Sequence, residues 1–409
     1  MGINKRYTFL VVTVIILILK TFVLVKGYID IPEQLIMSFY ILFCLVIYPK
    51  AFFNRATLCL VLFIVIFISI AIVKHFNLVW FYIKISEWIF ALAIWNILLY
   101  NKKYHNFRII GKVLLLVIIV NSLLTIPWAL MDASLVRNII QTSDEALREG
   151  ALKKGIVGYN FLHGLPAVFP IIIYWIKREK GFTKMWWFLL LAILYLLIVK
   201  ASLGTILIIS TIIIPVSFFI SKSNIKNVVV LIIFIVSSTI MTTNGFIKLI
   251  ENVEPYFIDT AIQPKLNDIK SSFTDNEAEG QIEARQYLYY KSWRAFFNFP
   301  LVGSTNKSDA GEHAFILDFL AWSGLFGTIP LLLFFFYLFK SAYNIVRKDT
   351  KIFFLLGISP FIILSFFKGT SSSIELIYAL ILVPCISFFH MKKVDIPKHT
   401  IGVLVKTTT

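Results

Sequence analysis

The feature that most constrains this chain is a series of long apolar runs that recur from its beginning to its end. One of them, Ala56 to Val73, has 18 residues and no charged side chain. A bilayer core about 30 Å thick is crossed by a helix of about 20 residues, because each residue advances the helix by about 1.5 Å. Backbone polar groups find no water inside lipid, so each run is expected to form a helix.

The composition agrees with a membrane protein. Of 409 residues, 59% are hydrophobic and 15% are charged, whereas soluble domains carry about 25% charged residues. We predict an all-α polytopic membrane protein with about 12 transmembrane helices. The first is expected to stay uncleaved, because no small-residue cleavage site follows it. The predicted spans are residues 7–25, 32–49, 56–73, 78–100, 109–130, 156–176, 185–200, 203–220, 227–243, 314–339, 352–367 and 373–390.

Basic residues collect in the loops on one side of the predicted bundle. Short cytoplasmic loops carry an excess of Lys and Arg, and this bias sets the orientation. The opposite short loops hold few bases, chiefly Lys26, Lys74 and Lys368. Both termini are therefore predicted to be cytoplasmic. The bases on that side are Lys50, Arg55, Lys102, Lys103, Arg108, Lys177, Arg178, Lys180, Lys184, Lys222, Lys226, Lys340, Arg347, Lys348, Lys351, Lys392, Lys393 and Lys398.

Two long segments are predicted on the outer side, a smaller loop at 131–155 and a large loop at 244–312. Neither is large and apolar enough to form a core of its own. Residues 1–391 are therefore predicted to form one membrane domain that includes both loops, and residues 392–409 a short cytoplasmic tail. The net charge of +17 lies largely in the short loops, so no nucleic acid partner is expected.

The sequence lacks the common motifs that bind nucleotides or catalytic metals. It has no GxxxxGK[ST], HExxH or GxSxG, and its outer loops hold no DxD pair. Its cysteines, Cys44, Cys59 and Cys385, all lie in apolar runs and form no CxxC pair, so neither a disulfide nor a thiolate metal site is expected. No metal and no cofactor are predicted.

Residues 283–297 show helical periodicity outside the spans. Arg285, Lys291 and Arg294 are interleaved with an aromatic face there. An interfacial helix on lipid headgroups accounts for this pattern. A phosphate clamp accounts for it as well, because Arg offers a rigid fork of donors to phosphate oxygens. The two interpretations are compatible, and both stay open. The aromatic residues, at steps of three and four, are Tyr289, Tyr290, Trp293, Phe296 and Phe297.

A turn and a histidine follow this segment. The PLVG sequence at 300–303 ends the predicted helix, and polar residues 304–311 form a turn before the next span. His313 starts that span. A lone histidine there is commonly an ordinary interfacial residue, but an imidazole titrates near neutral pH and can accept a proton from a hydroxyl. We predict His313 and Arg285, on the two sides of the turn, as the catalytic residues.

Charged residues inside spans are costly, so each is a candidate for function. Lys84 and Glu87 are three residues apart and are expected to pair with each other. Lys20 and Glu33 lie near span ends and are expected to be structural, with Lys20 extending toward the interface. Lys200 ends one span immediately before the next begins, so it is a candidate to face an outer cavity.

Three polar residues near the outer ends of spans are weaker candidates. Asn160 and His163 are i, i+3 neighbours, which either line a cavity or act as polar contacts in helix packing. Asp318 follows His313 by five residues, not quite on the same helical face. It either orients a partner or lines the cavity.

Residues Arg285 to Pro330 resemble the O-antigen polymerase and ligase family (Wzy and WaaL type), which are bacterial membrane proteins of polysaccharide synthesis. The likeness comprises Arg285 before a tryptophan-containing helix, the PLVG turn, His313 after a polar turn, and the run LDFLAWSGLFG at 317–327. The predicted topology also resembles that family, with a large outer loop before the last few helices.

The resemblance implies a metal-independent glycosyltransferase that joins undecaprenyl-pyrophosphate-linked oligosaccharide repeat units outside the bacterial cytoplasmic membrane. In such proteins basic residues grip the pyrophosphate and a loop histidine lies near the acceptor hydroxyl; these roles fall to Arg285 and His313. Many members carry an Arg after a Ser at the start of a mid-chain span, where this chain has Leu203. Lys200 or Arg148 is then the expected second cation. Further candidates for binding pyrophosphate or sugar are Lys291, Arg294, Asn160 and His163.

The resemblance also implies partners for a polymerase, namely membrane lipid, a chain-length regulator and a flippase.

Other classes of protein explain part of the pattern. A ligase of the same family, which transfers the chain to lipid A-core or protein, stays open against the polymerase. A flippase or other transporter would need polar residues spread through the bundle and commonly shows repeat symmetry, which this sequence lacks. A scaffolding protein accounts for neither the basic loop nor His313.

Overall fold

The computed structural model describes the greater part of the chain, and all regular structure in that part is helical. This confirms the all-α prediction. The span predicted at 227–243, the tail and much of the second outer loop lie outside the described residues. The residues that the structure describes are 5–28, 33–75, 78–101, 104–131, 144–201, 203–220, 251, 255, 263, 281–304, 306–367, 373–386 and 388–389.

Five of the described helices are long and apolar enough to cross a membrane, and a sixth crossing results if one bent pair counts as a single span. The five are α4 (Arg55–Val73), α5 (Leu78–Asn101), α6 (Tyr104–Met131), α11 (Gly181–Ala201) and α17 (Phe315–Ile345). The shorter apolar helices are α1 (Lys5–Thr21), α3 (Glu33–Ile47), α12 (Gly204–Phe219), α18 (Lys351–Phe367) and the segment of α19 (Ser373–Ile377) and α20 (Val383–Ile386). The total of twelve spans stays a prediction.

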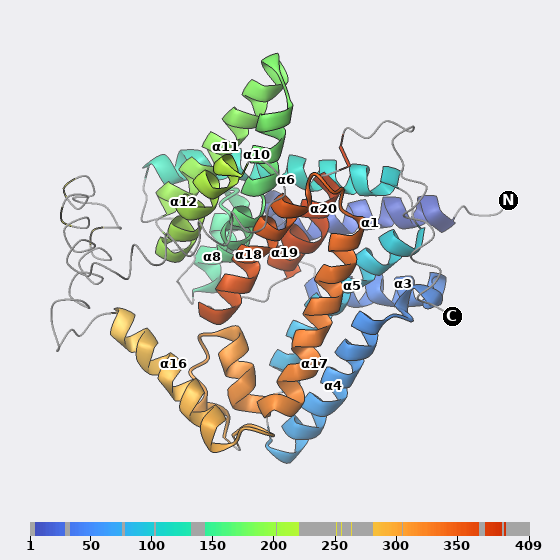
Figure 1. The fold of residues 1–409 in the computed structure, drawn as a ribbon, viewed down its shortest axis with the longest axis vertical. Helices are drawn as coiled ribbons and strands as arrows, with labels where there is room; N and C mark the ends of the chain where they lie inside the picture. Colours follow the sequence, from blue (N-terminus) through green and yellow to red (C-terminus); the bar gives the residue numbers. More distant parts are fainter. Residues whose placement is uncertain are drawn as a thin grey trace.

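Some helices pack on sequence neighbours, and others, such as α4 with α17, pack on helices distant in sequence (Figure 1). Helix α4 lies along α17, α3 lies along α5, and α10 (Phe169–Arg178) contacts α11, α12 and α18. The remaining helices are short or lie beside the bundle: α2 (Val23–Tyr28), α8 (Glu145–Lys153), α9 (Tyr159–Gly164) and α16 (Gln281–Asn298).

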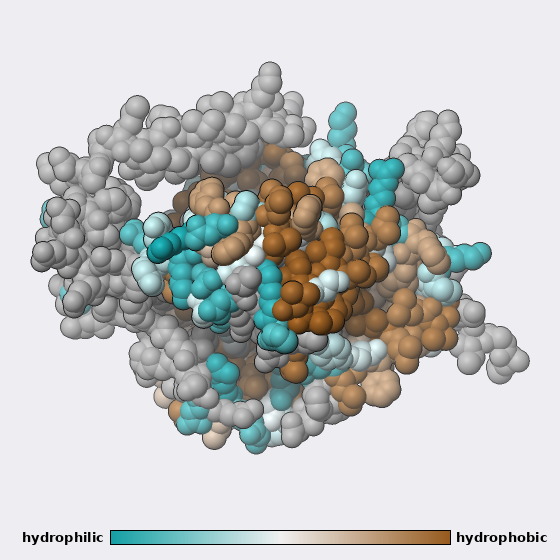
Figure 2. All heavy atoms as spheres, turned by 90° about the horizontal axis from the view of Figure 1, so that it is seen from below, coloured by the Kyte–Doolittle hydropathy of each residue, from teal (hydrophilic) through white to brown (hydrophobic). Residues whose placement is uncertain are grey.

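Helix α4 illustrates how the bundle divides its apolar side chains between core and surface. Phe63 and Phe67 are buried and pack on Phe319 of α17, each with ring centroids 5.6 Å apart. On the other face, Leu58 is 68% and Val61 is 51% exposed. Figure 2 shows a broad apolar area on one face of the molecule, bordered by hydrophilic residues. Contiguous exposed apolar surface of this kind is expected where a helix bundle meets lipid.

The span predicted at 156–176 is a bent pair of helices. Helices α9 and α10 meet at 41° across a 3-10 turn at Leu165–Ala167. Pro166 lies in this turn, and Pro170 lies in the first turn of α10. Each proline removes a backbone N–H donor and fixes its own φ, which explains why the helix bends here.

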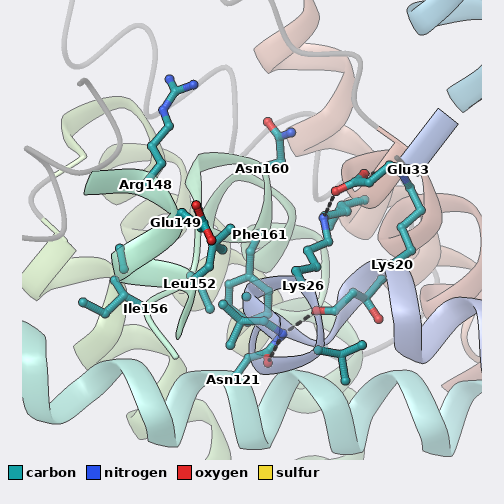
Figure 3. A pocket seen from close by; sticks show the side chains of 18 of the residues that line it. Lys20, Lys26, Glu33, Asn121, Arg148, Glu149, Leu152, Ile156, Asn160 and Phe161 are labelled. Carbon is teal, nitrogen blue, oxygen red and sulfur yellow. Dashed lines mark hydrogen bonds and ion pairs between the residues drawn. The ribbon is translucent and has the colours of Figure 1, made fainter. Parts of the chain in front are cut away.

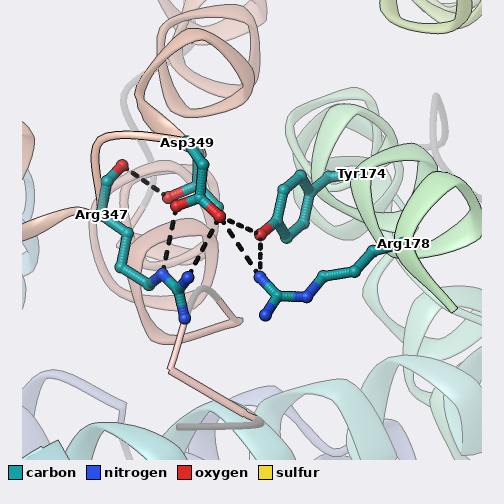
Figure 4. Close-up of polar contacts among 5 residues, drawn as sticks. Tyr174, Arg178, Arg347 and Asp349 are labelled. Atoms are coloured by element: carbon teal, nitrogen blue, oxygen red, sulfur yellow. Dashed lines mark hydrogen bonds and ion pairs between the residues drawn. The ribbon is translucent and has the colours of Figure 1, made fainter. Parts of the chain in front are cut away.

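A polar cluster joins α10 to the link between α17 and α18 (Figure 4). Asp349 accepts hydrogen bonds from the Tyr174 hydroxyl at 2.7 Å and from Arg347 Nε at 3.1 Å. Arg178 Nη1 lies 3.3 Å from the same carboxylate. Burial raises the pKa of Asp349, but the bonds from Tyr174 and Arg347 outweigh it, so the pKa lies below its usual value. This cluster fixes the end of the bundle that the charge bias predicts to be cytoplasmic.

Candidate functional site

A cavity of about 1330 Å³ lies where the C-terminal end of α1 meets α2, α8 and the first residues of α3 and α9. This is the end of the bundle that the charge bias predicts to be outer. The polar side chains that line it are Lys20, Thr21, Lys26, Tyr28, Glu33, Asn121, Arg148, Glu149, Lys153, Tyr159 and Asn160. The apolar ones include Leu19, Val23, Val25, Ile36, Leu152, Ile156, Phe161 and Ile374.

One wall of the cavity is an ion-paired group of two lysines and a glutamate. Glu33 Oε1 lies 2.5 Å from Lys26 Nζ, and Glu33 Oε2 lies 2.9 Å from Lys20 Nζ. The Lys20 side chain is only 3% exposed, which corrects the expectation that it extends toward the interface. Burial lowers the pKa of Lys26, while the charge of Glu33 opposes that shift. Two lysines thus share one carboxylate in this wall.

Arg148 lies across the cavity from this group (Figure 3). Figure 3 shows Arg148 on one side, the Lys26–Glu33 pair on the other and Asn160 between them. Arg148 is carried by α8, which lies in the predicted outer loop at 131–155. Asp144 caps α8 by accepting hydrogen bonds from the first backbone N–H groups, Ala146 N at 2.9 Å and Leu147 N at 3.3 Å. Arg148 lines the cavity, and its role as the second cation stays a prediction.

Close packing at Gly27 brings α8 to the cavity. A Cβ on Gly27 would lie 2.6 Å from the backbone carbonyl carbon of Leu152, which is closer than atoms can approach. Glycine at this position thus allows α2 and α8 to touch. The charged residues of α2 and α8 face one space because of this contact.

Asn121 is a cavity residue that sequence reasoning missed. It is 1% exposed and lies in the middle of a predicted span. Its amide nitrogen donates to Thr21 O at 2.8 Å, and its amide oxygen accepts from Val23 N at 3.1 Å. These bonds satisfy backbone groups at the break between α1 and α2. The feature of the sequence that could have indicated this residue is an asparagine side chain inside an otherwise apolar run.

A buried ionisable pair lies beneath the cavity. His163 Nδ1 is 3.4 Å from Glu375 Oε1, and both residues are 3% exposed. Glu375 was not singled out from the sequence, although a carboxylate inside a predicted span is a recognised signal. Glu87 interacts electrostatically with Lys84, its expected partner, and also with Lys20, Glu33 and Glu375, so it belongs to a wider group of charges.

The second set of candidate residues lies around the N-terminus of α17. The His313 ring faces Tyr289 of α16, with centroids 6.0 Å apart. Asp318 is 3% exposed and accepts hydrogen bonds from Ser292 Oγ at 2.7 Å and from Ala314 N at 2.9 Å. Asp318 therefore ties α16 to the start of α17 and holds the turn that carries His313.

Arg285 lies in the second turn of α16, and its side chain is outside the described residues. It precedes Tyr289 by four residues, so its backbone position is on the face of α16 that carries Tyr289. That Arg285 and His313 face a common region stays a prediction.

Two glycines build the turn between α16 and α17. Helix α17, predicted as one continuous span, is broken at Gly324, where φ is 57°. A Cβ on Gly324 would lie 2.4 Å from the carbonyl carbon of Leu301, and a Cβ on Gly303 (φ 73°) would lie 2.4 Å from that of Trp322. Only glycine fits both the positive φ and the close approach.

Backbone hydrogen bonds complete this turn. Leu325 N donates to Pro300 O at 2.9 Å, and Ser304 N donates to Ala321 O at 2.7 Å. Lys74, at the C-terminal end of α4, donates to three carbonyl oxygens: Val302 at 2.6 Å, Gly303 at 2.9 Å and Trp322 at 3.2 Å. Burial lowers the pKa of Lys74. The PLVG turn thus pairs the backbone groups that the broken helix leaves open.

The predicted substrate-binding residues therefore fall into separate groups. Arg148 and Asn160 line the cavity, and His163 lies beneath it. Lys291 and Arg294 lie on α16, and Lys200 lies in the last turn of α11. The described residues that line the cavity do not include Lys200, Lys291, Arg294 or His313.

Neither a metal-binding cluster nor a match to a known protein narrows the range of reactions that this site could perform. Within the described part of the chain, no group of three or more His, Cys, Asp or Glu side chains could hold a metal ion. No protein-family profile and no curated protein matches the sequence.

Proposed function

We propose that this protein is a polysaccharide polymerase of the O-antigen or capsule type. It joins undecaprenyl-pyrophosphate-linked oligosaccharide repeat units at the outer face of the bacterial cytoplasmic membrane. The observation that carries the proposal is the cavity of about 1330 Å³, whose wall combines basic and apolar side chains. A lipid-linked donor has an anionic pyrophosphate next to a hydrocarbon chain, and a cavity of this composition at the end of an apolar bundle suits both parts.

Lys26 and Arg148 are the cations we assign to the pyrophosphate within this cavity. Negative charge grows on the pyrophosphate as the sugar leaves it, and fixed cations stabilise that charge in the transition state. The guanidinium of Arg148 can bind two phosphate oxygens at once. This assignment gives the second cation, which the resemblance left between Lys200 and Arg148, to Arg148 together with Lys26.

Arg285 and His313 keep the roles that the family resemblance implies. The acceptor hydroxyl attacks the anomeric carbon, and the bond from that carbon to the pyrophosphate breaks with its electron pair on the leaving group. In the roles that the resemblance implies, the hydroxyl proton passes to the His313 imidazole and Arg285 contacts the pyrophosphate; His313 is not among the described residues that line the cavity. The outcome is inversion at the anomeric carbon, and the activated lipid supplies the driving force without a metal or cofactor.

Deletion of the gene, followed by gel analysis of surface glycans, tests this function. A polymerase deletion leaves single repeat units attached to the surface. Long but unattached polymer would identify a ligase, and lipid-linked units retained on the cytoplasmic side would identify a flippase. An unchanged glycan profile would rule out all three. Complementation with Arg148→Ala, Arg285→Ala and His313→Ala then tests the residues, with immunoblotting to show equal protein amounts.

A further inference from the structure

Three residues lie one behind another from the surface of the cavity into the core. Tyr159, the first residue of α9, lines the cavity and is partly exposed. Its ring centroid lies 3.7 Å from that of His163, with the planes at 44°. His163 is buried, and its Nδ1 lies 3.4 Å from Glu375. The aromatic ring at the cavity surface therefore lies against an imidazole whose Nδ1 is close to a buried carboxylate.

Burying a carboxylate and an imidazole here carries a cost. Ionisable side chains are costly to remove from water, and a hydrophobic pair of similar volume is often as stable or more so. Ionisable residues inside a membrane bundle commonly mark functional sites. Ile374, the neighbour of Glu375, lines the cavity itself. The pair therefore lies next to the cavity through both of its chain segments.

Both segments are also irregular where they meet. Helix α9 has only six residues and ends at Gly164, where a Cβ would lie 2.4 Å from Cδ2 of Tyr378. Tyr378 opens a π-helical turn, Tyr378–Leu382, directly after α19. Such turns are rare and occur frequently at functional sites. Gly164 and the π-helical turn bring His163 and Glu375 together behind Tyr159.

We propose that Tyr159 is a sugar-contacting residue of the cavity and that His163 and Glu375 are positioning residues for its ring. This inference rests on the proposed function, because it takes the ligand of the cavity to be an oligosaccharide. A tyrosine offers a rigid apolar face and a polar hydroxyl edge, which match the C–H face and the hydroxyls of a pyranose ring. The imidazole beneath it fixes the height and tilt of that face.

The first test compares Tyr159→Phe with Tyr159→Leu. Membranes that contain each full-length variant are given lipid-linked repeat units extracted from the deletion strain, and the rate of polymer formation is measured. Phenylalanine keeps the ring face and loses only the hydroxyl, so its rate should fall much less than that of the leucine variant. Leucine removes the face, and a misplaced sugar is expected to cost about tenfold to a hundredfold in rate. Equal rates for the leucine variant and the wild type would overturn the proposal.

The second test separates ring support from imidazole chemistry. The double variants His163→Phe/Glu375→Gln and His163→Ala/Glu375→Gln both remove the pair without leaving an unpaired buried charge. They differ in the ring beneath Tyr159. The phenylalanine double variant should retain most of the wild-type rate, and the alanine double variant should fall with Tyr159→Leu. Equal loss in both would show that the imidazole acts by another route and would overturn the positioning role.

The deletion strain separates this inference from the proposed function. A deletion with an unchanged glycan profile removes the proposed function and the inference with it. A deletion that abolishes polymer, combined with full polymer in cells expressing Tyr159→Leu, removes only the inference. Immunoblotting of each variant controls for folding, and the two Tyr159 variants decide the contact role if the alanine double variant does not accumulate.

Discussion

The cavity and the α16–α17 turn hold the two sets of candidate residues, and they are built in opposite ways. The turn is a backbone structure: Gly303 and Gly324 allow two chain segments to touch, and main-chain hydrogen bonds and Lys74 join them. The cavity is a side-chain structure, in which charged groups from α1, α2, α3 and α8 converge on one space.

This difference shows which parts of a site a contiguous sequence motif can mark. The run with the family resemblance is contiguous, and much of it is explained by the backbone geometry of the turn, as at Gly303 and Gly324. The cavity has no contiguous motif, because Lys26, Glu33 and Arg148 come from separate segments. A motif can therefore mark the framework beside a site while the charges that bind the ligand lie elsewhere in the sequence.

The backbone character of the turn predicts the largest effect. Gly324→Ala places a side chain at positive φ, which costs about 1–2 kcal/mol, and against the Leu301 carbonyl, which adds about 1–3 kcal/mol of overpacking. Thermal unfolding of the purified protein in detergent should show a loss of about 3 kcal/mol in the free energy of unfolding. Gly150→Ala is the matched control, because a Cβ there meets nothing within 4 Å; equal stability of the two variants would contradict the turn's geometry.

The side-chain character of the cavity predicts a loss of activity with little loss of stability. Lys26→Met keeps the length of the side chain and removes the ammonium that we assign to the pyrophosphate. Polymer formation from lipid-linked units should fall by about a hundredfold, as expected when one group that stabilises transition-state charge is lost. Lys184→Met, which removes an exposed lysine of α11, should leave the rate unchanged. A normal rate for Lys26→Met would move the pyrophosphate away from this cavity.

The tether between α16 and α17 predicts an intermediate effect. Asp318→Ala removes both carboxyl oxygens, so the hydrogen bonds from Ser292 and Ala314 are both lost. The free energy of unfolding should fall by about 1–3 kcal/mol, because a buried donor is left unpaired. Ser308→Ala, an exposed change in the same turn, should shift it by less than about 0.5 kcal/mol. Similar values for both would mean that Asp318 does not hold the turn.

The polar cluster at Asp349 predicts the smallest effect and a dependence on pH. The pKa of Asp349 is lower in the folded protein than in the unfolded chain, so its charged form stabilises the fold above the unfolded pKa of about 3.9. That stabilisation is lost as the pH falls through the folded pKa. The side chain is 45% exposed, so Asp349→Asn should cost less than about 1 kcal/mol at neutral pH. The difference from the wild type should shrink below about pH 4; a difference that persisted in acid would exclude this charge effect.

Much of the helical layout followed from local sequence. Apolar runs such as 56–73 predicted α4 and the other long helices, because the need to satisfy backbone polar groups in lipid leaves few alternatives to a helix. The breaks were not predicted. Gly324 and Pro166 each lie in segments that were predicted as continuous spans, and a helix accepts or breaks at such residues according to what packs against it.

What the sequence determined by itself is the class of molecule: an all-helical chain whose apolar runs suit a membrane. Sequence could also say that a charge such as Lys20 or Glu375 inside an apolar run requires a partner. Only the tertiary structure decided which partner it has. Lys20 pairs with Glu33, and Glu375 pairs with His163 on a distant helix. The reason is physical: the cost of burying charge is a local property of the residue, whereas its compensation depends on which helices pack together.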